Sequence, residues 1–184
     1  MVCTRPRSRS LLVLPVLAGF IAGLGLVTFE QPGQARPTSR ILRVVHKRLA
    51  YQLRWGSPVV RQRAATTLGQ LRFNRSSTRA LTASLQSDPA PRVRKATAEA
   101  LGRIGRKVRW TSIFVVKRAA LEDTDREVRI AAIQTLHRIG PAAVVANTSG
   151  QVLARDRDST VRRTAATVLG TLGRRATPAL RYLE

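Results

Sequence analysis

Arginine and aspartate are the residues of this sequence whose types and spacing could do chemistry. A guanidinium and a carboxylate held close together form charge-assisted hydrogen bonds, which are stronger than those between neutral groups. Three times along the chain an aspartate stands six residues before an arginine, in the pairs Asp88 and Arg94, Asp123 and Arg129, and Asp156 and Arg162. This recurrence predicts a structural Asp–Arg ladder rather than a reaction centre.

The sequence offers little for catalysis or for metal binding. Its single cysteine is Cys3, and its two histidines, His46 and His137, stand 91 positions apart. We expect both histidines at the surface. The acidic run 122–127 lacks the glycine and the terminal glutamate of a calcium loop. No serine-hydrolase, zinc-protease or P-loop motif occurs. We therefore predict no catalytic residue, no metal and no cofactor, and we do not expect an enzyme.

The aspartates and arginines belong to a unit that recurs four times. A Val-Arg pair begins at Val60, Val93, Val128 and Val161, with spacings of 33, 35 and 33 residues. Apolar or small residues at positions 0, 4, 5, 8 and 11 from each valine form one stripe at helical period. Shorter apolar runs predict a further helix before each copy, over residues 39–53, 79–87, 112–122 and 142–155, with a fifth beginning at residue 177. The run 142–155 contains Asn147–Gly150, which predicts an interruption. We expect about nine helices, paired antiparallel, and no sheet.

The helix ends and the repeated arginine follow from the same pattern. Gly105, Gly140 and Gly173 stand where a left-handed C-terminal cap is typical. The arginine after each valine lies inside the apolar stripe, where an unpaired charge is costly. Aspartates at the turns would pair these arginines and bridge neighbouring repeats. The first copy has Trp55 at the place of the aspartate, so Arg61 either pairs elsewhere or faces solvent.

The repeated pattern D-x₄-V-R-x₂-A-A-x₂-L-G-x-[LI]-G resembles the HEAT-like repeats first associated with phycobilisome lyases. The resemblance covers residues 39–184. It implies an all-α fold, an α-solenoid of about four and a half stacked helix pairs, with a concave surface lined by the Val-Arg helices. It says little about function, because such repeats serve bilin attachment, nucleic-acid binding, scaffolding and regulation alike. His137 stands where the pattern has glycine.

Residues 1–35 form a separate segment ahead of the repeat domain, residues 36–184. Three arginines precede an uncharged run of 19 residues from Leu11 to Phe29, and the small residues Gly33 and Ala35 follow. These are the elements of a secretory signal peptide cleaved after Ala35, which predicts an exported, periplasmic or secreted protein. The alternative is a retained anchor whose residues 11–29 contact the membrane, since about 20 apolar residues span a bilayer. In that case the basic residues after the run favour a cytoplasmic body.

Positive charge is the remaining signal of function. The chain carries 33 Lys and Arg against 10 Asp and Glu, a formal net charge of +23. At outward positions of the Val-Arg helices stand five cations, which stacking would align into a basic strip: Arg63, Lys95, Arg103, Arg138 and Arg163. Such a strip attracts acidic proteins, nucleic acids and other polyanions. Alternatively, arginine enrichment reflects genome composition and the face is merely solvated.

Two functions of different classes follow from these observations. The first is a non-catalytic scaffold or adaptor that binds a protein partner, expected to be acidic, through its concave basic surface after export. The alternative is a cytoplasmic or membrane-anchored solenoid that binds nucleic acid, although the interleaved aromatic residues typical of single-strand binders are missing. A third, an accessory role in attaching bilin to an antenna protein, rests on the resemblance alone.

Overall fold

The computed structural model describes residues 39–71 and 73–182. The expected signal peptide or anchor, residues 1–35, lies outside these ranges, and both its cleavage and the domain boundary at residue 36 stay predictions. Within them the chain forms eight α-helices and two 3₁₀ segments, and no strand. The elements are α2 (Ser39–Trp55), α3 (Pro58–Gln70), α4 (Arg75–Ser87), α5 (Pro91–Ile104), η1 (Gly105–Lys107), α6 (Trp110–Glu122), α7 (Arg126–Ile139), α8 (Ala142–Arg155), α9 (Ser159–Leu172) and η2 (Gly173–Tyr182).

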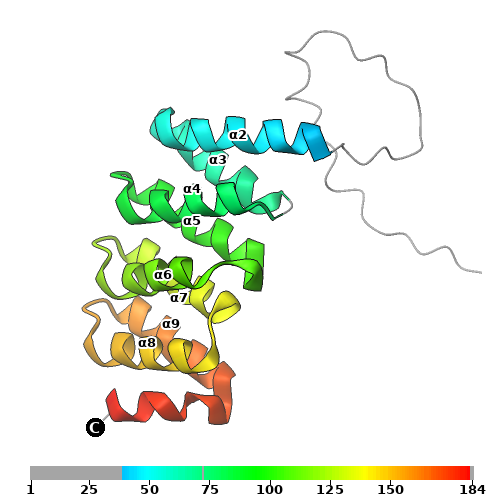
Figure 1. Cartoon of the computed structure of the whole chain (residues 1–184). Coiled ribbons are helices and arrows are strands. Elements are labelled where there is room, and N and C mark those ends of the chain that lie inside the picture. Colours follow the sequence, from blue (N-terminus) through cyan, green and yellow to red (C-terminus); the bar gives the residue numbers. More distant parts are fainter. Residues whose placement is uncertain (1–38, 72, 183–184) are drawn as a thin grey trace, which may run out of the picture. The chain divides into compact units, whose positions relative to one another are not determined.

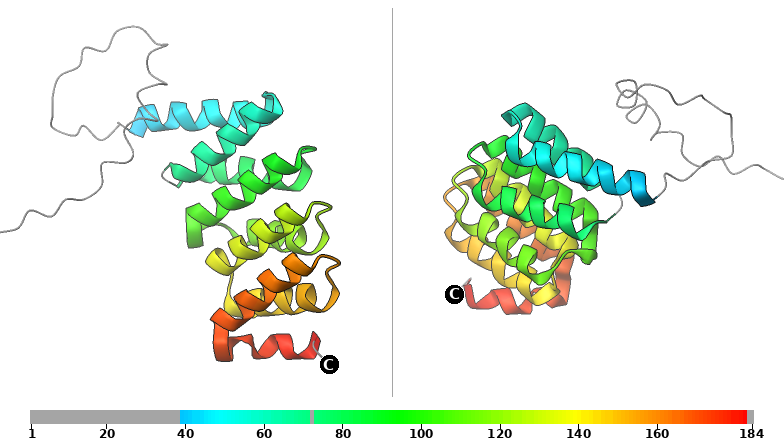
Figure 2. Two further views of the ribbon diagram at one scale, coloured as in Figure 1. Left: turned by 180° about the vertical axis from the view of Figure 1, so that it is seen from behind. Right: turned by 45° about the horizontal axis from the view of Figure 1, so that its top comes forward.

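The helices of the repeat domain stack in two rows (Figures 1 and 2). One row holds α2, α4, α6, α8 and η2, and the other holds α3, α5, α7 and α9, which carry the four Val-Arg pairs. Each helix packs against its partner in the pair and against the equivalent helix of the next pair. The prediction of an all-α stack of helix pairs is confirmed for the described residues. The half repeat at the end is the 3₁₀ segment η2, where we expected an α-helix.

Short polar residues start most of the Val-Arg helices. Ser57 accepts from the backbone N–H of Val60 ahead of α3, and Pro58 occupies the first helical position. Asp125 and Asp158 accept from two backbone N–H groups each at the starts of α7 and α9. Their negative charge also favours the positive end of the helix dipole. Local sequence therefore sets where these helices begin.

The repeated apolar residues form one continuous core between the two rows. Val93, Val128 and Val161 are fully buried, and Leu68, Leu101 and Leu136 are within 1% of full burial. Small residues let successive helices of one row pack tightly: a Cβ on Gly69 of α3 would stand 2.6 Å from the Cα of Ala100 in α5. Each helix pair thus buries its apolar faces only by stacking on its neighbours, as expected for a repeat array.

The expected interruption of the helix over residues 142–155 was wrong. Helix α8 runs through Asn147–Gly150 without a break, and Thr148, Ser149 and Gly150 are buried. These small residues admit η2, because a Cβ on Gly150 would lie 2.9 Å from Ala179 and from Tyr182. Tertiary packing thus overrides the turn-like local sequence.

The three glycines expected to cap helices differ in backbone conformation. Gly105 and Gly173 adopt positive φ values of 74° and 53°, which glycine permits at a helix end. Gly140 is extended instead, with φ −81° and ψ 153°. The following Pro141 disfavours helical conformations of the residue before it, which explains the difference.

His46, expected at the surface, is buried in the packing of α2 against α4. It is only 4% exposed, and its Nδ1 lies 2.7 Å from the hydroxyl of Ser77. His137 is exposed on α7, as its place on the helix predicted. None of the helices in the described ranges has the length and apolar character needed to span a membrane.

Candidate interaction surface and the Asp–Arg ladder

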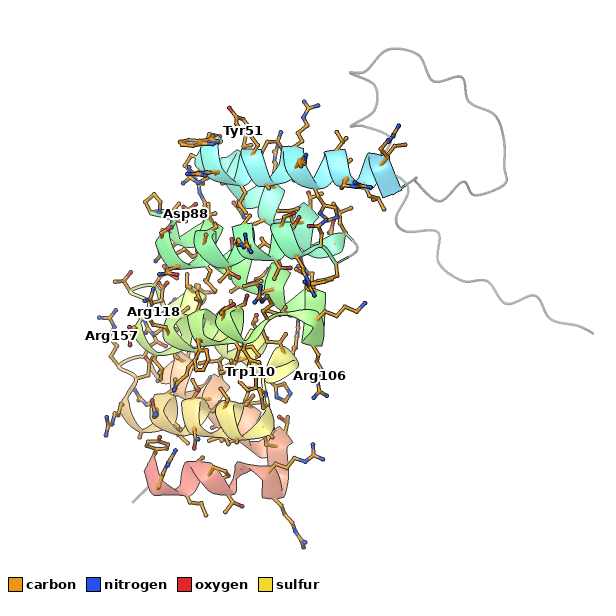
Figure 3. The ribbon with its side chains drawn as sticks, viewed as in Figure 1. Tyr51, Asp88, Arg106, Trp110, Arg118 and Arg157 are labelled. Atoms are coloured by element: carbon orange, nitrogen blue, oxygen red, sulfur yellow. The ribbon has the colours of Figure 1, made fainter. Side chains whose placement is uncertain are left out.

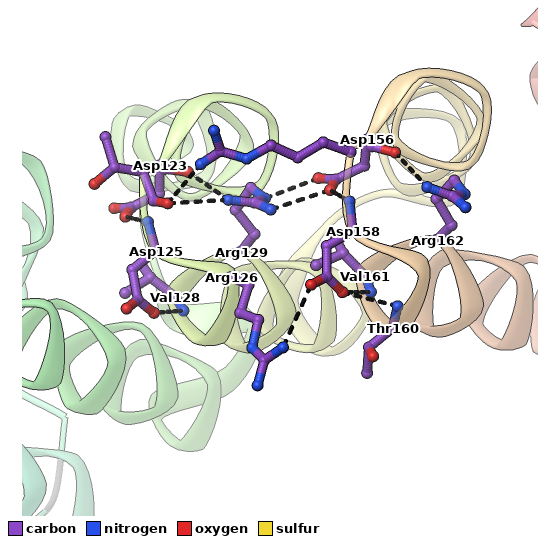
Figure 4. A network of polar contacts seen from close by, with 12 residues as sticks. Asp123, Asp125, Arg126, Val128, Arg129, Asp156, Asp158, Thr160, Val161 and Arg162 are labelled. Atoms are coloured by element: carbon purple, nitrogen blue, oxygen red, sulfur yellow. Dashed lines mark hydrogen bonds and ion pairs between the residues drawn. The ribbon is translucent and has the colours of Figure 1, made fainter.

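Arg94 and Arg129 each bond to the aspartate of the following repeat. The Arg94 guanidinium donates from Nε and Nη2 to the two carboxylate oxygens of Asp123, at 2.8 and 2.7 Å. Arg129 makes the same bidentate contact with Asp156, at 2.8 and 3.1 Å (Figure 4). This fork geometry fixes direction as well as distance between neighbouring repeats.

The same arginines also hold the turn of their own repeat. Nη1 of Arg94 donates to the backbone carbonyl of Asp88 at 2.9 Å, and Nη1 of Arg129 donates to that of Asp123 at 2.8 Å. Each aspartate in turn accepts from the backbone N–H two residues later, as Asp123 does from Asp125. One arginine therefore clamps two successive turns. The six-residue spacing in the sequence corresponds to the carbonyl contact, and the carboxylate contact crosses to the next repeat.

The ends of the ladder differ from its middle. Arg61, whose own repeat lacks the aspartate, donates to Asp88 at 2.7 and 2.9 Å and to the carbonyl of Gly56 at 2.9 Å. Arg162 reaches only the carbonyl of Asp156, at 2.8 Å, and forms no ion pair in the described part of the chain. Arg61 is followed by a repeat whose turn carries Asp88, whereas the segment η2 that follows the helix of Arg162 carries no aspartate.

The electrostatics of the ladder favour the charged forms. The hydrogen bonds that Arg61 donates to Asp88 raise the pKa of the Arg61 guanidinium above its ordinary value, and those that Arg94 donates to Asp123 raise the pKa of Arg94 in the same way. Arg129 is the most enclosed member, with 4% of its side chain exposed against 5% for Asp156. A charge so deeply placed is tolerated because every carboxylate oxygen has a donor. The paired arginines and aspartates bond to each other and to the turns, an arrangement typical of a structural role rather than of a substrate site.

The five residues of the basic strip lie on the outer sides of the Val-Arg helices, but they are not equivalent. Lys95 of α5 donates to Glu127 of α7 at 2.9 Å, and this bond raises the pKa of Lys95. Arg103 lies 3.6 Å from Glu99, one helical turn earlier. The other three are exposed and form no ion pair within residues 39–71 and 73–182: Arg63, Arg138 and Arg163. The strip therefore presents three uncompensated guanidiniums on α3, α7 and α9.

Close packing supports Arg138. A Cβ placed on Gly102 of α5 would lie 3.6 Å from Cδ of Arg138, so the aliphatic part of this side chain lies along α5. Arg103 follows Gly102 directly, so Arg103 and Arg138, which share position 10 in two successive repeats, lie near each other. The stem is packed and the guanidinium is left to solvent.

Sequence reasoning missed the carboxylates that neutralise part of the strip. Glu99 stands four residues before Arg103, a spacing that places both on one helix face and that could have been noticed. Glu127 could not have been assigned to Lys95, because their contact depends on how α5 and α7 are offset. The exposed aromatic residues of the first row, Trp110 with Phe114 on α6 and Tyr51 on α2, were missed as well (Figure 3).

Stacked helix pairs clamped by turn-to-turn arginines define a helical repeat protein. A family model described as HEAT repeats matches residues 47–110 and 117–184, and the chain belongs to this family. HEAT repeats are commonly scaffolds for protein interaction and are typically not enzymes. Comparison with curated proteins gave no match.

Proposed function

We propose that this HEAT-repeat protein is a non-catalytic adaptor that binds an acidic protein partner through the outer surface of α3, α5, α7 and α9. The observation that carries the proposal is the uncompensated set Arg63, Arg138 and Arg163. Each projects from a helix whose opposite side is committed to the core, so the three are held on a rigid support. The helices fix the backbone positions of these cations before a partner binds, so binding costs only the freedom of the side chains.

The distribution of charge favours a folded acidic protein over a nucleic acid. Lys95 and Arg103 lie between the free guanidiniums and are paired with Glu127 and Glu99. The surface thus offers separated cations rather than an unbroken track. Binding of nucleic acid rests on many phosphate contacts along a continuous backbone, whereas separate carboxylates on a folded surface match separate arginines. A role in bilin attachment has only the resemblance of the repeats to phycobilisome-lyase-type units behind it, and no contact in the structure favours it.

The place of action follows from residues 1–35 and is part of the proposal. We expect export, with cleavage after Ala35, so that the partner is a periplasmic or secreted protein. Retention of the segment as a membrane anchor would instead tether the adaptor to a bilayer.

The test is site-specific photo-cross-linking in the native host. A photoreactive phenylalanine analogue replaces Arg138 in one variant and Arg118, which is exposed on α6 in the other row, in the matched control (Figure 3). We expect a discrete protein adduct from position 138 that disappears when Arg63 and Arg163 are changed to Glu. Position 118 should not give this adduct.

Three outcomes would overturn the proposal. They are an adduct at position 138 that nuclease removes, an adduct that survives both charge reversals, and equal adducts from the two positions. Circular dichroism of the charge-reversed variant should match the parent protein, because Arg63 and Arg163 are exposed and lie outside the core.

A further inference from the structure

The first helix of the array, α2, exposes large apolar side chains that the stack does not cover. Four of its apolar residues are more than half exposed: Ile41 at 55%, Val44 at 63%, Tyr51 at 67% and Trp55 at 65%. The other side of α2 packs through Leu49 and Leu53 against α3 and α4. The outward residues are separated by three, seven and four positions, so they share one side of the helix.

The same exposed side carries a strong positive charge. Arg40, Arg43, Lys47 and Arg54 are all exposed, and Ser39–Trp55 contains no acidic residue. At 100° per residue these four cations lie on one half of the exposed arc and the four apolar side chains lie on the other, where the exposed Arg48 lies as well. The Arg54 guanidinium lies 4.9 Å from the centre of the Trp55 ring. A helix with cations beside an aromatic and aliphatic strip is typical of segments that lie in a membrane interface.

The position of α2 in the stack explains why this face stays open. Every later helix of the first row has a preceding helix of that row packed on it, as α2 packs on α4. No described element packs on α2 from that side, and Tyr51 projects from the side of α2 turned away from α4 (Figure 3). Terminal repeats are usually closed by a polar outer face. This terminal helix has an amphipathic one instead.

We infer that the outer face of α2 docks on the surface of an anionic lipid bilayer. Tyrosine and tryptophan place an apolar ring and a polar edge at the headgroup level, where Val44 and Ile41 add apolar area. The neighbouring arginines and lysine meet lipid phosphates, and each cation near an anionic surface strengthens binding about fivefold. This face lies on the opposite row from Arg63, Arg138 and Arg163, so a bilayer and a protein partner can be held together.

The sequence ahead of α2 agrees with this placement. The apolar run ends at Phe29 and α2 begins at Ser39, which leaves nine intervening residues. Fully extended, they span about 30 Å. While the apolar run remains in a bilayer, α2 is therefore confined to the neighbourhood of its surface, and the docked state needs no long-range search. After cleavage the cations and aromatic residues of α2 act alone.

The two tryptophans of the chain give a matched test in the full-length protein. Trp110→Phe leaves Trp55 as the reporter on α2, and Trp55→Phe leaves Trp110, which is 56% exposed on α6. Each form is reconstituted in vesicles of phosphatidylcholine with about one-third phosphatidylglycerol, some of it brominated in the acyl chains. We expect about twofold quenching of Trp55 and little of Trp110. In phosphatidylcholine alone the chain is equally tethered, but Trp55 should lose most of its quenching.

Charge neutralisation separates docking from tethering. Arg40, Lys47 and Arg43 changed to Gln should lower the ratio of docked to undocked protein about a hundredfold, from three fivefold steps. The control changes Arg106, Lys107 and Arg109, which are exposed beside η1, to Gln. It alters net charge equally and should leave Trp55 quenched. All six residues are exposed, and circular dichroism checks that both variants fold.

The inference is overturned if Trp55 is no more quenched with phosphatidylglycerol than without it, or if Trp110 is quenched as strongly as Trp55. It also fails if both glutamine variants lose quenching alike, since net charge alone would then account for the binding. Shielding of Trp55 by added RNA, with no quenching by lipid, would assign the face to nucleic acid instead. None of these results touches the cross-linking test at Arg138, so the two proposals fail independently.

Discussion

Removing the guanidinium of Arg129 should destabilise the array more than any other single ladder substitution. Arg129→Ala deletes two bonds to Asp156, at 2.8 and 3.1 Å, and the 2.8 Å bond to the carbonyl of Asp123. It also leaves the Asp156 carboxylate, 5% exposed, with only the backbone N–H of Asp158 as a donor. Breaking a buried pair by removing one partner costs about 3–5 kcal/mol. For a chain of this size that lowers Tm by on the order of 10 °C.

Two other arginines are matched controls for the separate parts of this loss. Arg162 occupies the same place in the last repeat but makes only the carbonyl contact, so Arg162→Ala should cost about 1 kcal/mol. Arg126 has 62% of its side chain exposed and lies 3.5 Å from Asp158. Arg126→Ala should therefore cost less than about 0.5 kcal/mol. Urea unfolding followed by helical circular dichroism gives all three free energies on one scale.

The comparison between Arg129 and Arg162 decides the reasoning. If the two substitutions lowered the free energy of unfolding equally, the carboxylate bridge between repeats would contribute nothing, and the arginine would act only on its own turn. Asp156→Ala adds a further check, because it should cost less in the Arg129→Ala background than alone. Independent effects of the two changes would refute the coupling that the bidentate geometry implies.

Three further predictions follow from the packing, the caps and the leader. Gly69→Ala should cost about 1–3 kcal/mol, because its Cβ would stand 2.6 Å from the Cα of Ala100. Gly170→Ala meets no atom within 4 Å and should be neutral or stabilising by up to about 1 kcal/mol. Urea unfolding measures both changes in the free energy of unfolding. Asp158 accepts from the start of α9, chiefly the backbone N–H of Val161, which lowers its pKa. The stabilisation that Asp158 contributes is therefore present above the unfolded pKa and is lost as pH falls below about 4. Asp158→Asn keeps a capping side chain but cannot titrate, so it should reduce the fall of Tm with decreasing pH. An unchanged fall of Tm would refute this. Mass spectrometry of the native protein should find its N-terminus directly after Ala35 if the leader is cleaved, and an intact leader would establish the anchored alternative.

The repeat period was readable because it is a property of residue order alone. A valine, an arginine and a leucine recur in phase, and the helical stripe that they predict lies in the buried core except at the two ends, where Val60 and Leu169 are half-buried. The register of the ladder was not readable. A six-residue spacing shows that Asp123 and Arg129 belong to one turn, but which repeat supplies each carboxylate depends on the offset between stacked helices. That offset is set by close contacts such as the one between Gly69 and Ala100.

Local composition misled at two places for physical reasons. His46 stands among basic residues that face solvent, yet its place on the helix turns it inward, where Ser77 satisfies its ring nitrogen. Asn147–Gly150 has the composition of a turn, but its small side chains make room for η2 against α8. In both cases a tertiary neighbour decided the outcome, and no window along the sequence contains that neighbour.

The outer faces are basic because most carboxylates are bonded at the turns and between the helices. In the ranges that the structure describes, nearly every acidic side chain has a structural partner. Asp88, Asp123 and Asp156 hold ladder arginines, Asp125 and Asp158 cap helices, and Glu99 and Glu127 pair with the strip. Stacking repeats in this way draws negative charge to the turns and to the seams between helices.

The exposed arginines that remain are therefore not balanced by scattered acidic neighbours, and their field extends about a Debye length, some 8 Å, into solvent at physiological salt. The two rows then differ in what accompanies that charge. The Val-Arg helices present isolated guanidiniums on an otherwise polar surface, which suits carboxylates on a folded partner. Helix α2 adds exposed tyrosine, tryptophan and aliphatic side chains to its cations, which suits a surface with an apolar interior beneath an anionic layer. The charge imbalance comes from the composition, 33 basic against 10 acidic residues, and the ladder concentrates the excess on the outer faces. In the two proposals above, that excess would serve two kinds of docking on opposite rows of the same stack.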